Sequence, residues 1–281
     1  MAGVLVVSTV GTSILGNVET KWLDRVPEKY RGLVKGSSRL SVTDERQREF
    51  EARAHPGDEL FDAVYRVLEA SPREASAELN ALLGFLERRK GSLAGADVEL
   101  MFYSTDTGTG YFCARLVERY ARERLRGALG GARVQVQEPV KLKKFGWGYE
   151  YFHEALLDMV DKAARLMANK KRSGYRVYVN ATAGFKVEAA YLTLVSLLVG
   201  ADSVFYVHEA TRDVIELPVL PLGLKAKYAD ALRELREPTP RGALERRGVS
   251  VEELEEKGLV EVRDGLVVAR EWVRKLLELV E

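Results

Sequence analysis

The sequence has little of what would place a protein outside the cell or in a membrane. It contains one cysteine, Cys113, in 281 residues, which excludes an internal disulfide and is typical of a reducing compartment. Its longest apolar run, Ala189 to Ala201, is shorter than the roughly 20 residues that cross a bilayer. The first residues lack the charged region and the cleavage site of a signal peptide. These absences predict a cytoplasmic protein with no membrane partner.

An excess of charge of either sign is also missing. Lys and Arg number 43 against 42 Asp and Glu, whereas a general nucleic-acid binder is usually visibly basic. Any anion site must therefore be local. The phosphate-binding pattern G-x-x-x-x-G-K-[S/T] does not occur, which excludes a P-loop ATPase. His, Cys, Asp and Glu show no metal-ligand spacing, so we expect neither a metal nor another cofactor.

Alternating strand and helix patterns define the fold class. They imply right-handed crossovers and a mostly parallel, doubly wound, Rossmann-like α/β sheet. We assign this domain to residues 1–222, with a long helical stretch at 18–90 and an antiparallel edge hairpin formed by the last two strands. Strand patterns fall at Val4–Ser8, Val98–Ser104, Arg133–Gln137, Arg176–Asn180, Val204–His208 and Val214–Val219. Helical patterns fall at Glu59–Leu68, Glu74–Arg89, Tyr111–Leu125, Glu150–Met167 and Val187–Val199.

A second, smaller unit is predicted at residues 223–281. A helix, a turn, a helix and then a hairpin with an Asp-Gly turn follow one another, which is the order of a winged helix-turn-helix. The second helix carries four glutamates against one lysine, so DNA phosphates would repel it. We therefore favour a structural or dimerising module over DNA binding. The expected elements are Lys225–Arg236, Arg241–Arg247, Ser250–Lys257, Leu259–Arg263, Leu266–Ala269 and Arg270–Val280.

Three strands of the first domain run into loops rich in small and hydroxylated residues. Ligands of a doubly wound sheet bind beyond the carboxyl ends of the strands, and such loops offer backbone N–H groups and hydroxyls that can hold phosphates. Helix caps alone would explain any one of these loops, but the three together predict a site. The candidates are Gly11, Thr12 and Ser13 in the first loop, Thr105, Asp106, Thr107 and Gly108 in the second, and Asn180, Thr182, Ala183, Gly184 and Phe185 in the third.

Lys186 follows the third loop, in the first turn of a long apolar helix. A cation there faces the positive end of the helix dipole, which costs up to about 1 kcal/mol. Lysine is therefore a poor choice for stability and a good one for receiving an anion.

The second loop also permits a different interpretation. Gly108-Thr-Gly110 matches the first half of the dinucleotide-binding pattern, with Cys113 where a small residue belongs, and Glu138 ends the next strand where a ribose-binding acid could lie. A nicotinamide-dependent Rossmann enzyme is therefore a remote alternative.

Three motifs resemble a known family. Ser-Thr-Val-Gly-Thr-Ser-Ile-Leu at 8–15, Tyr-Ser-Thr-Asp-Thr-Gly at 103–108 and Asn-Ala-Thr-Ala-Gly-Phe-Lys at 180–186 resemble the CRISPR-associated Rossmann-fold (CARF) proteins. The chain is most similar to the stand-alone CRISPR ring nucleases of archaea. The resemblance implies a homodimer that binds cyclic tetra-adenylate across its two-fold axis. It also implies metal-independent cleavage to linear di-adenylate with a 2′,3′-cyclic phosphate, which switches off type III CRISPR signalling. The family's active-site serine and lysine fall on Ser13 and Lys186.

The chemistry of the residues agrees with this resemblance. Cleavage to a cyclic phosphate needs an in-line ribose 2′-oxygen and stabilisation of charge on the phosphorane, which Lys186 and the amides beside it could supply. Ser13 or Thr12 could hold the 2′-hydroxyl or a phosphate oxygen. No histidine is an obvious general base, so we expect slow catalysis by positioning. A CARF sensor that binds the ring without cutting it is the main alternative.

One further loop could contribute to the site. Residues 141–152 mix lysines with aromatic rings, which could stack adenines and pair phosphates or could equally lie in a dimer contact.

Overall fold

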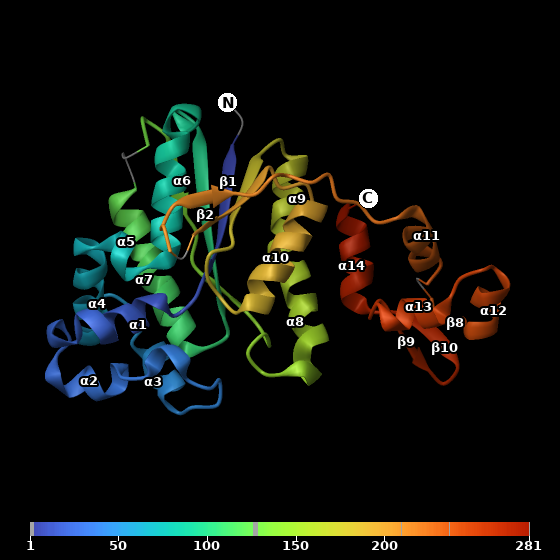
Figure 1. The fold of residues 1–281 in the computed structure, drawn as a ribbon, viewed down its shortest axis with the longest axis horizontal. Coiled ribbons are helices and arrows are strands. Elements are labelled where there is room, and N and C mark those ends of the chain that lie inside the picture. The colour runs from blue at the N-terminus through green and yellow to red at the C-terminus, as the bar shows by residue number, and fades with distance from the viewer. Residues whose placement is uncertain (1–2, 126–128, 209, 236, 281) are drawn as a thin grey trace.

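The computed structural model describes residues 3–125, 129–208, 210–235 and 237–280. Figure 1 shows a sheet between two helical layers, with a smaller unit at one side. The strands are β1 Val4–Val10, β2 Asp97–Thr105, β3 Arg133–Val136, β4 Val140–Leu142, β5 Arg176–Asn180, β6 Ser203–Val207, β7 Val214–Glu216, β8 Thr239–Pro240, β9 Val260–Arg263 and β10 Leu266–Ala269. The α-helices are α1 Ser13–Lys21, α2 Glu28–Val34, α3 Arg46–Ala52, α4 Glu59–Ala70, α5 Pro72–Ala75, α6 Ala77–Leu93, α7 Gly108–Arg124, α8 Phe152–Met159, α9 Arg165–Arg172, α10 Lys186–Leu198, α11 Ala226–Glu234, α12 Arg241–Arg246, α13 Val251–Glu256 and α14 Glu271–Val280.

The larger sheet has the strand order β3-β2-β1-β5-β6-β7, and β4 also pairs with β2. Its pairings are parallel except for β6 with β7, which are antiparallel. The chain moves outward from β1 to β2 and β3, then returns to the other side of β1 and moves outward again through β5 and β6. The order therefore reverses between β1 and β5, which is where an open α/β sheet binds its ligands. The predicted fold class is confirmed.

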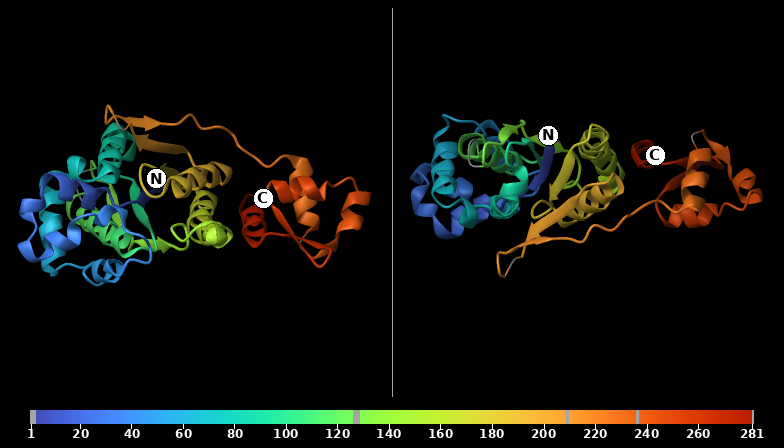
Figure 2. Two further views of the ribbon diagram at one scale, coloured as in Figure 1. Left: turned by 60° about the horizontal axis from the view of Figure 1, so that its bottom comes forward. Right: turned by 90° about the horizontal axis from the view of Figure 1, so that it is seen from above.

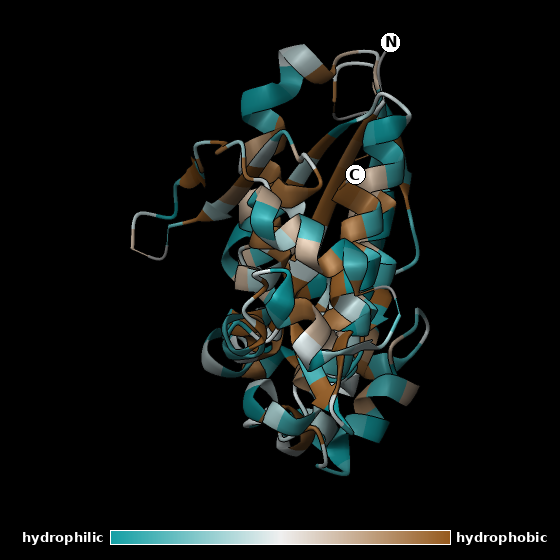
Figure 3. Cartoon of the chain, turned by 90° about the vertical axis from the view of Figure 1, so that its right-hand side faces the viewer, coloured by the Kyte–Doolittle hydropathy of each residue, from teal (hydrophilic) through white to brown (hydrophobic). Residues whose placement is uncertain are grey.

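Alternate residues of β1 feed two hydrophobic layers, as the two-residue period of a strand requires. Val4 and Val6 pack with α1, α4, α6 and α7, whereas Leu5 and Val7 pack with α8, α9 and α10. Both layers exclude water from the sheet, so the strands themselves are apolar on both faces, and Figure 3 shows them as brown ribbons inside the molecule. None of the described helices is both long and apolar enough to cross a membrane.

The structure corrects several predicted boundaries. The helix expected at 150–167 is α8 and α9 joined by a π-helical turn, Val160–Ala164, which a 3.6-residue period cannot reveal. The helix expected at 74–89 is divided at Ser76, whose hydroxyl accepts the Leu79 N–H and starts α6. Strand β4 was missed because it has only three residues, and β7 ends at Glu216 instead of Val219.

The tail contains the predicted helices and hairpin in the predicted order. Asp264 and Gly265 have φ of 51° and 77°, the left-handed pair that a two-residue turn between β9 and β10 requires. The expected end of the first tail helix, Arg236, lies outside the described residues. Figure 2 shows that residues 217–225 run as an extended connection to this unit. The last helix, α14, packs against α8, and its Lys275 forms an ion pair of 2.5 Å with Asp161.

Candidate functional site

A cleft of 390 Å³ opens at the carboxyl ends of β1, β2 and β5. All three predicted loops contribute to it. Residues 38–40 also contribute; they belong to the long helical stretch at 18–90, the helical insert, and their place in the cleft was not predicted. The cleft is therefore at the switch point of the sheet, where its strand order reverses. It is lined by Gly11, Thr12, Ser38, Arg39, Leu40, Thr105, Thr107, Thr109, Gly184 and Phe185.

The first and third loops touch through glycine. A Cβ atom built on Gly11 would lie 3.0 Å from the amide nitrogen of Gly184, so even a methyl group at residue 11 would have to push the third loop away. Gly184 has φ of 101°, a conformation that glycine adopts far more readily than other residues. The hydroxyl of Thr9 also donates a hydrogen bond to the carbonyl of Ala183. These contacts hold the two loops side by side.

Asn180 and Thr182 shape the third loop from inside. Asn180 is fully buried, and its Nδ2 donates to the carbonyl of Glu78 at 3.1 Å. Its Oδ1 accepts the Thr182 hydroxyl at 2.6 Å and the Thr182 N–H at 3.3 Å. Neither residue lines the cleft. Both support the loop through these hydrogen bonds, and their role in ligand binding stays a prediction.

Ser13 also does not line the cleft, although its neighbour Thr12 does. The Ser13 hydroxyl donates to Glu78 Oε2 at 2.8 Å and accepts the Ala77 N–H at 3.2 Å. The other oxygen of Glu78 accepts the Gly11 N–H at 2.8 Å. Glu78 is 1% exposed and lies on α6, so a buried carboxylate from the insert anchors the first loop.

The second loop starts α7 and is covered by the insert. The Thr107 hydroxyl caps the helix by accepting the Gly110 N–H at 3.1 Å, and it lies 3.1 Å from the Thr105 hydroxyl. Gln47 of α3 accepts the N–H of Thr109 at 2.9 Å. A Cβ atom on Gly108 would come within 1.7 Å of the Gln47 carbonyl oxygen. The amides of this helix start are therefore largely used within the protein.

Asp106 joins the second loop to the loop at residues 141–152, the aromatic segment. Its Oδ2 accepts the Trp147 indole N–H at 3.0 Å and the Lys144 backbone N–H at 3.2 Å. The Lys144 ammonium lies 4.4 Å from the Trp147 ring centroid and 4.2 Å from that of Tyr151. This segment therefore lies beside the site, but its rings and its cation already contact one another.

Two cations at the site form no ion pair or hydrogen bond with another described side chain. Arg39 lines the cleft and is exposed. Lys186 is exposed as well and begins α10 directly after Phe185, which lines the cleft. An anion in the cleft would therefore meet the positive charge of Arg39, which pairs with no carboxylate of the described residues, with Lys186 next in sequence to the lining residue Phe185.

A third carboxyl lies beneath the third loop. Glu188 is fully buried, and its carboxyl carbon would be 3.3 Å from a Cβ on Gly184. Burial raises its pKa to about 8. The negative charge of Asp106 raises the pKa further, whereas the nearby Phe185 amide lowers it. Neither carboxyl oxygen of Glu188 has a hydrogen-bond partner among the described residues. Glu188 is therefore mostly uncharged at neutral pH.

Sequence reasoning missed Glu78, Gln47, Arg39 and Glu188. The only available signal was for Glu188, because a glutamate three residues after a helix cap often faces back to the cap. Within the described ranges, no group of three or more His, Cys, Asp and Glu side chains could hold a metal ion.

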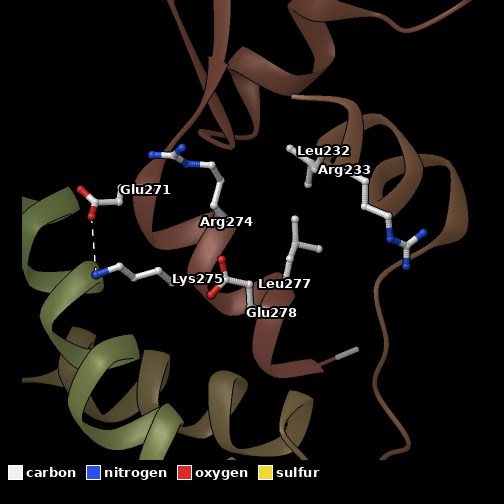
Figure 4. Close-up of a pocket in the computed structure, with 7 residues that line it drawn as sticks. All are labelled: Leu232, Arg233, Glu271, Arg274, Lys275, Leu277 and Glu278. Atoms are coloured by element: carbon white, nitrogen blue, oxygen red, sulfur yellow. Dashed lines mark ion pairs between the residues drawn. The ribbon is translucent and has the colours of Figure 1, made fainter. Parts of the chain in front are cut away.

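A larger hollow of 490 Å³ lies far from these loops in the fold, between α11 and α14. Figure 4 shows Glu271 and Lys275 in an ion pair, 3.5 Å long, at its edge. None of its lining residues belongs to the three loops.

The fold and the cleft define an α/β protein with a polar cleft at its switch point. Residues 73–220 match a family described as CRISPR-associated protein (Cas_APE2256). The match covers more than half of the chain and includes Glu78, the second and third loops and Lys186. The chain therefore belongs to this CRISPR-associated family.

Proposed function

We propose that this CRISPR-associated protein is a ring nuclease. It binds cyclic tetra-adenylate and cuts it to linear di-adenylate ending in a 2′,3′-cyclic phosphate, without metal, and so ends type III CRISPR signalling. The observation that carries this proposal is the cleft at the switch point, where three polar loops meet the Arg39 guanidinium and where Lys186 follows the lining residue Phe185. Neither cation has an ion-pair partner among the described residues.

The cleft suits a phosphodiester ligand. Gly11, Gly184 and Phe185 line it, Thr105 and Thr107 bring hydroxyls to it, and Arg39 brings a guanidinium. Phosphate oxygens are good acceptors for hydroxyl and guanidinium donors. The Phe185 ring is 46% exposed and is available to stack on an adenine.

Lys186 and the first loop would carry the chemistry. An ammonium at the start of α10 would stabilise charge on the phosphorane, while Ser13 or Thr12 would hold the attacking ribose 2′-oxygen. Because the ring has two-fold symmetry, its site requires a symmetric pair of chains. The proposed protein is therefore a homodimer with the cleft of each copy facing the shared ligand.

A sensor that binds the ring without cutting it is the second candidate. It is favoured by Ser13, which is bonded to Glu78 and does not line the cleft. Such a sensor would have to pass its signal on through the tail, residues 223–281. DNA contact remains disfavoured there, because α13 is acidic and its Glu253 already pairs with Lys227.

The nicotinamide-dependent alternative has little support. Gly108 is pressed against Gln47 of the insert, where a pyrophosphate would have to approach. Glu138, the proposed ribose-binding acid, instead forms an ion pair of 3.0 Å with Arg115.

One assay separates cleavage from binding. Purified protein is incubated with cyclic tetra-adenylate in excess EDTA, and the products are separated by chromatography. We expect linear di-adenylate with a 2′,3′-cyclic phosphate. A ring that is bound but intact after many hours would instead establish the sensor, and a ring that does not bind would overturn both candidates.

A further inference from the structure

The proposed cleavage lacks an obvious proton acceptor, because no histidine lies in the three loops. The structure brings one carboxylate to the first loop. Glu78 belongs to α6, in the helical insert, and is 1% exposed. Its position is far from the loop in sequence but directly behind it in space.

Glu78 accepts hydrogen bonds from the first loop with both oxygens. Oε1 accepts the Gly11 N–H at 2.8 Å. Oε2 accepts the Ser13 hydroxyl at 2.8 Å and the Ser76 hydroxyl at 2.7 Å. These donors compensate the buried charge, and they fix the hydrogen of the Ser13 hydroxyl on the side of the carboxylate.

This orientation determines what Ser13 can offer to a ligand. A hydroxyl has one hydrogen and two acceptor positions. The hydrogen goes to Glu78, and one acceptor position takes the Ala77 N–H at 3.2 Å. The remaining acceptor position is open, and Ser13 is half-buried beside the cleft residue Thr12. Ser13 can therefore accept a hydrogen bond from a ligand, but its own hydrogen is already directed at Glu78.

We propose that Glu78 is a positioning residue that orients Ser13 and takes its proton when the ribose 2′-hydroxyl attacks. This inference rests on the proposed ring-nuclease function. The 2′-hydroxyl gives its proton to Ser13 Oγ while Ser13 gives its own proton to Glu78 Oε2. The 2′-oxygen bonds to phosphorus, the bond to the 5′-oxygen breaks, and the 5′-oxygen takes a proton from the Lys186 ammonium. Solvent then carries the extra proton from Glu78 to Lys186.

The test compares Glu78→Gln with the wild type. Glutamine keeps the shape of the side chain but cannot take the proton of Ser13. We expect kcat for cyclic tetra-adenylate to fall about 100-fold or more, while the Kd for the ring changes less than about threefold. Glu78→Asp withdraws the carboxylate from Ser13 but keeps its charge, and we expect a similar fall in kcat.

A control variant separates this role from a loss of stability. Asp58 caps α4 in the same insert by accepting the N–H groups of Leu60 and Phe61, and it does not touch the first loop. Asp58→Ala should lower the melting temperature but leave kcat within about threefold of the wild type, because a lost cap costs about 1 kcal/mol of stability. If either Glu78 variant folds and keeps kcat within about threefold of the wild type, the proposed proton relay from the 2′-hydroxyl through Ser13 to Glu78 is wrong. If the wild type itself leaves the ring intact, the proposed function falls together with the relay.

Discussion

Gly11 and Gly184 come from loops 173 residues apart in the sequence, yet a Cβ atom on Gly11 would lie 3.0 Å from the Gly184 amide nitrogen. This contact joins the loop after β1 to the loop after β5 at the switch point of the sheet. Both glycines line the cleft, so this contact forms part of its wall.

Gly11→Ala should widen this contact. The added methyl group must displace the third loop by a few tenths of an ångström, and overpacking of this kind costs about 1–3 kcal/mol. We expect weaker binding of cyclic tetra-adenylate together with lower stability, measured by calorimetric titration and by urea unfolding. Gly91→Ala is the matched control, because no atom lies within 4 Å of its added Cβ and alanine stabilises a helix interior by about 0.5–1 kcal/mol. Unchanged affinity in Gly11→Ala would contradict a role for this contact in the site.

Lys186→Ala should separate catalysis from binding. The lysine has no ion-pair partner among the described residues, so its removal leaves no carboxylate uncompensated, and the fold should be unaffected. If the ammonium stabilises the phosphorane, kcat should fall about 100-fold or more, while the Kd for the ring rises less than about tenfold. Rapid-quench cleavage and equilibrium binding measure the two effects.

Lys225→Ala is the control for this loss of one positive charge. Lys225 is also exposed, but it lies at the start of α11 in the connection to the tail. We expect no change in kcat or Kd. Equal losses in both variants would show that general electrostatic attraction, and not the position of Lys186, accounts for the effect.

Gly108→Ala should release the insert from the second loop. The new methyl group would come within 1.7 Å of the Gln47 carbonyl oxygen, so α3 or the start of α7 must move. The hydrogen bond from the Thr109 N–H to Gln47 would be lost with this movement. We expect a loss of stability of about 3 kcal/mol or more and faster proteolysis near residues 40–55. Gly32→Ala in α2 should show neither change, because no atom lies within 4 Å of its added Cβ. If Gly108→Ala also kept its stability and its resistance to proteolysis, the contact between Gly108 and Gln47 would be refuted.

The sequence alone was sufficient to predict the sheet and the place of the cleft. Strands β1, β2 and β5 each give a recognisable strand pattern, and the switch-point rule places their carboxyl ends together. Gly11, Thr12, Thr105, Thr107, Gly184 and Phe185 were predicted from that rule and line the cleft.

The residues behind the loops could not be predicted in this way. Glu78 meets Ser13 across 65 positions and Gln47 meets Thr109 across 62, and no local pattern specifies how the insert folds back. Asn180 and Thr182 were predicted to bind a ligand from their residue types. The structure adds the hydrogen bonds that they make inside the protein, and ligand binding by these two residues stays a prediction.

Glu188 should make stability depend on pH. Its pKa is about 8 in the folded protein, against 4.5 for an ordinary glutamate, so between these values the folded state binds a proton that the unfolded state has released. Stability must therefore fall as pH rises from about 5 to about 8, by at most about 1.4 kcal/mol per pH unit from this group. Below pH 4.5 both states are protonated, and above pH 8 both are ionised, so the slope from this group should vanish at both ends.

Glu188→Gln isolates this contribution. Glutamine fills the same space beside Gly184 and cannot ionise, so the variant should gain stability over the wild type as pH rises through this window. Urea unfolding of both proteins at pH 5, 6, 7 and 8 gives the difference directly. The gain should be smallest at pH 5 and largest at pH 8, because across this range the unfolded wild type has released the proton that its folded state must still bind. A difference in unfolding free energy between variant and wild type that stays constant across the series would mean that Glu188 is charged in the folded protein. Its negative charge beneath the third loop would then repel the phosphates of an incoming ring.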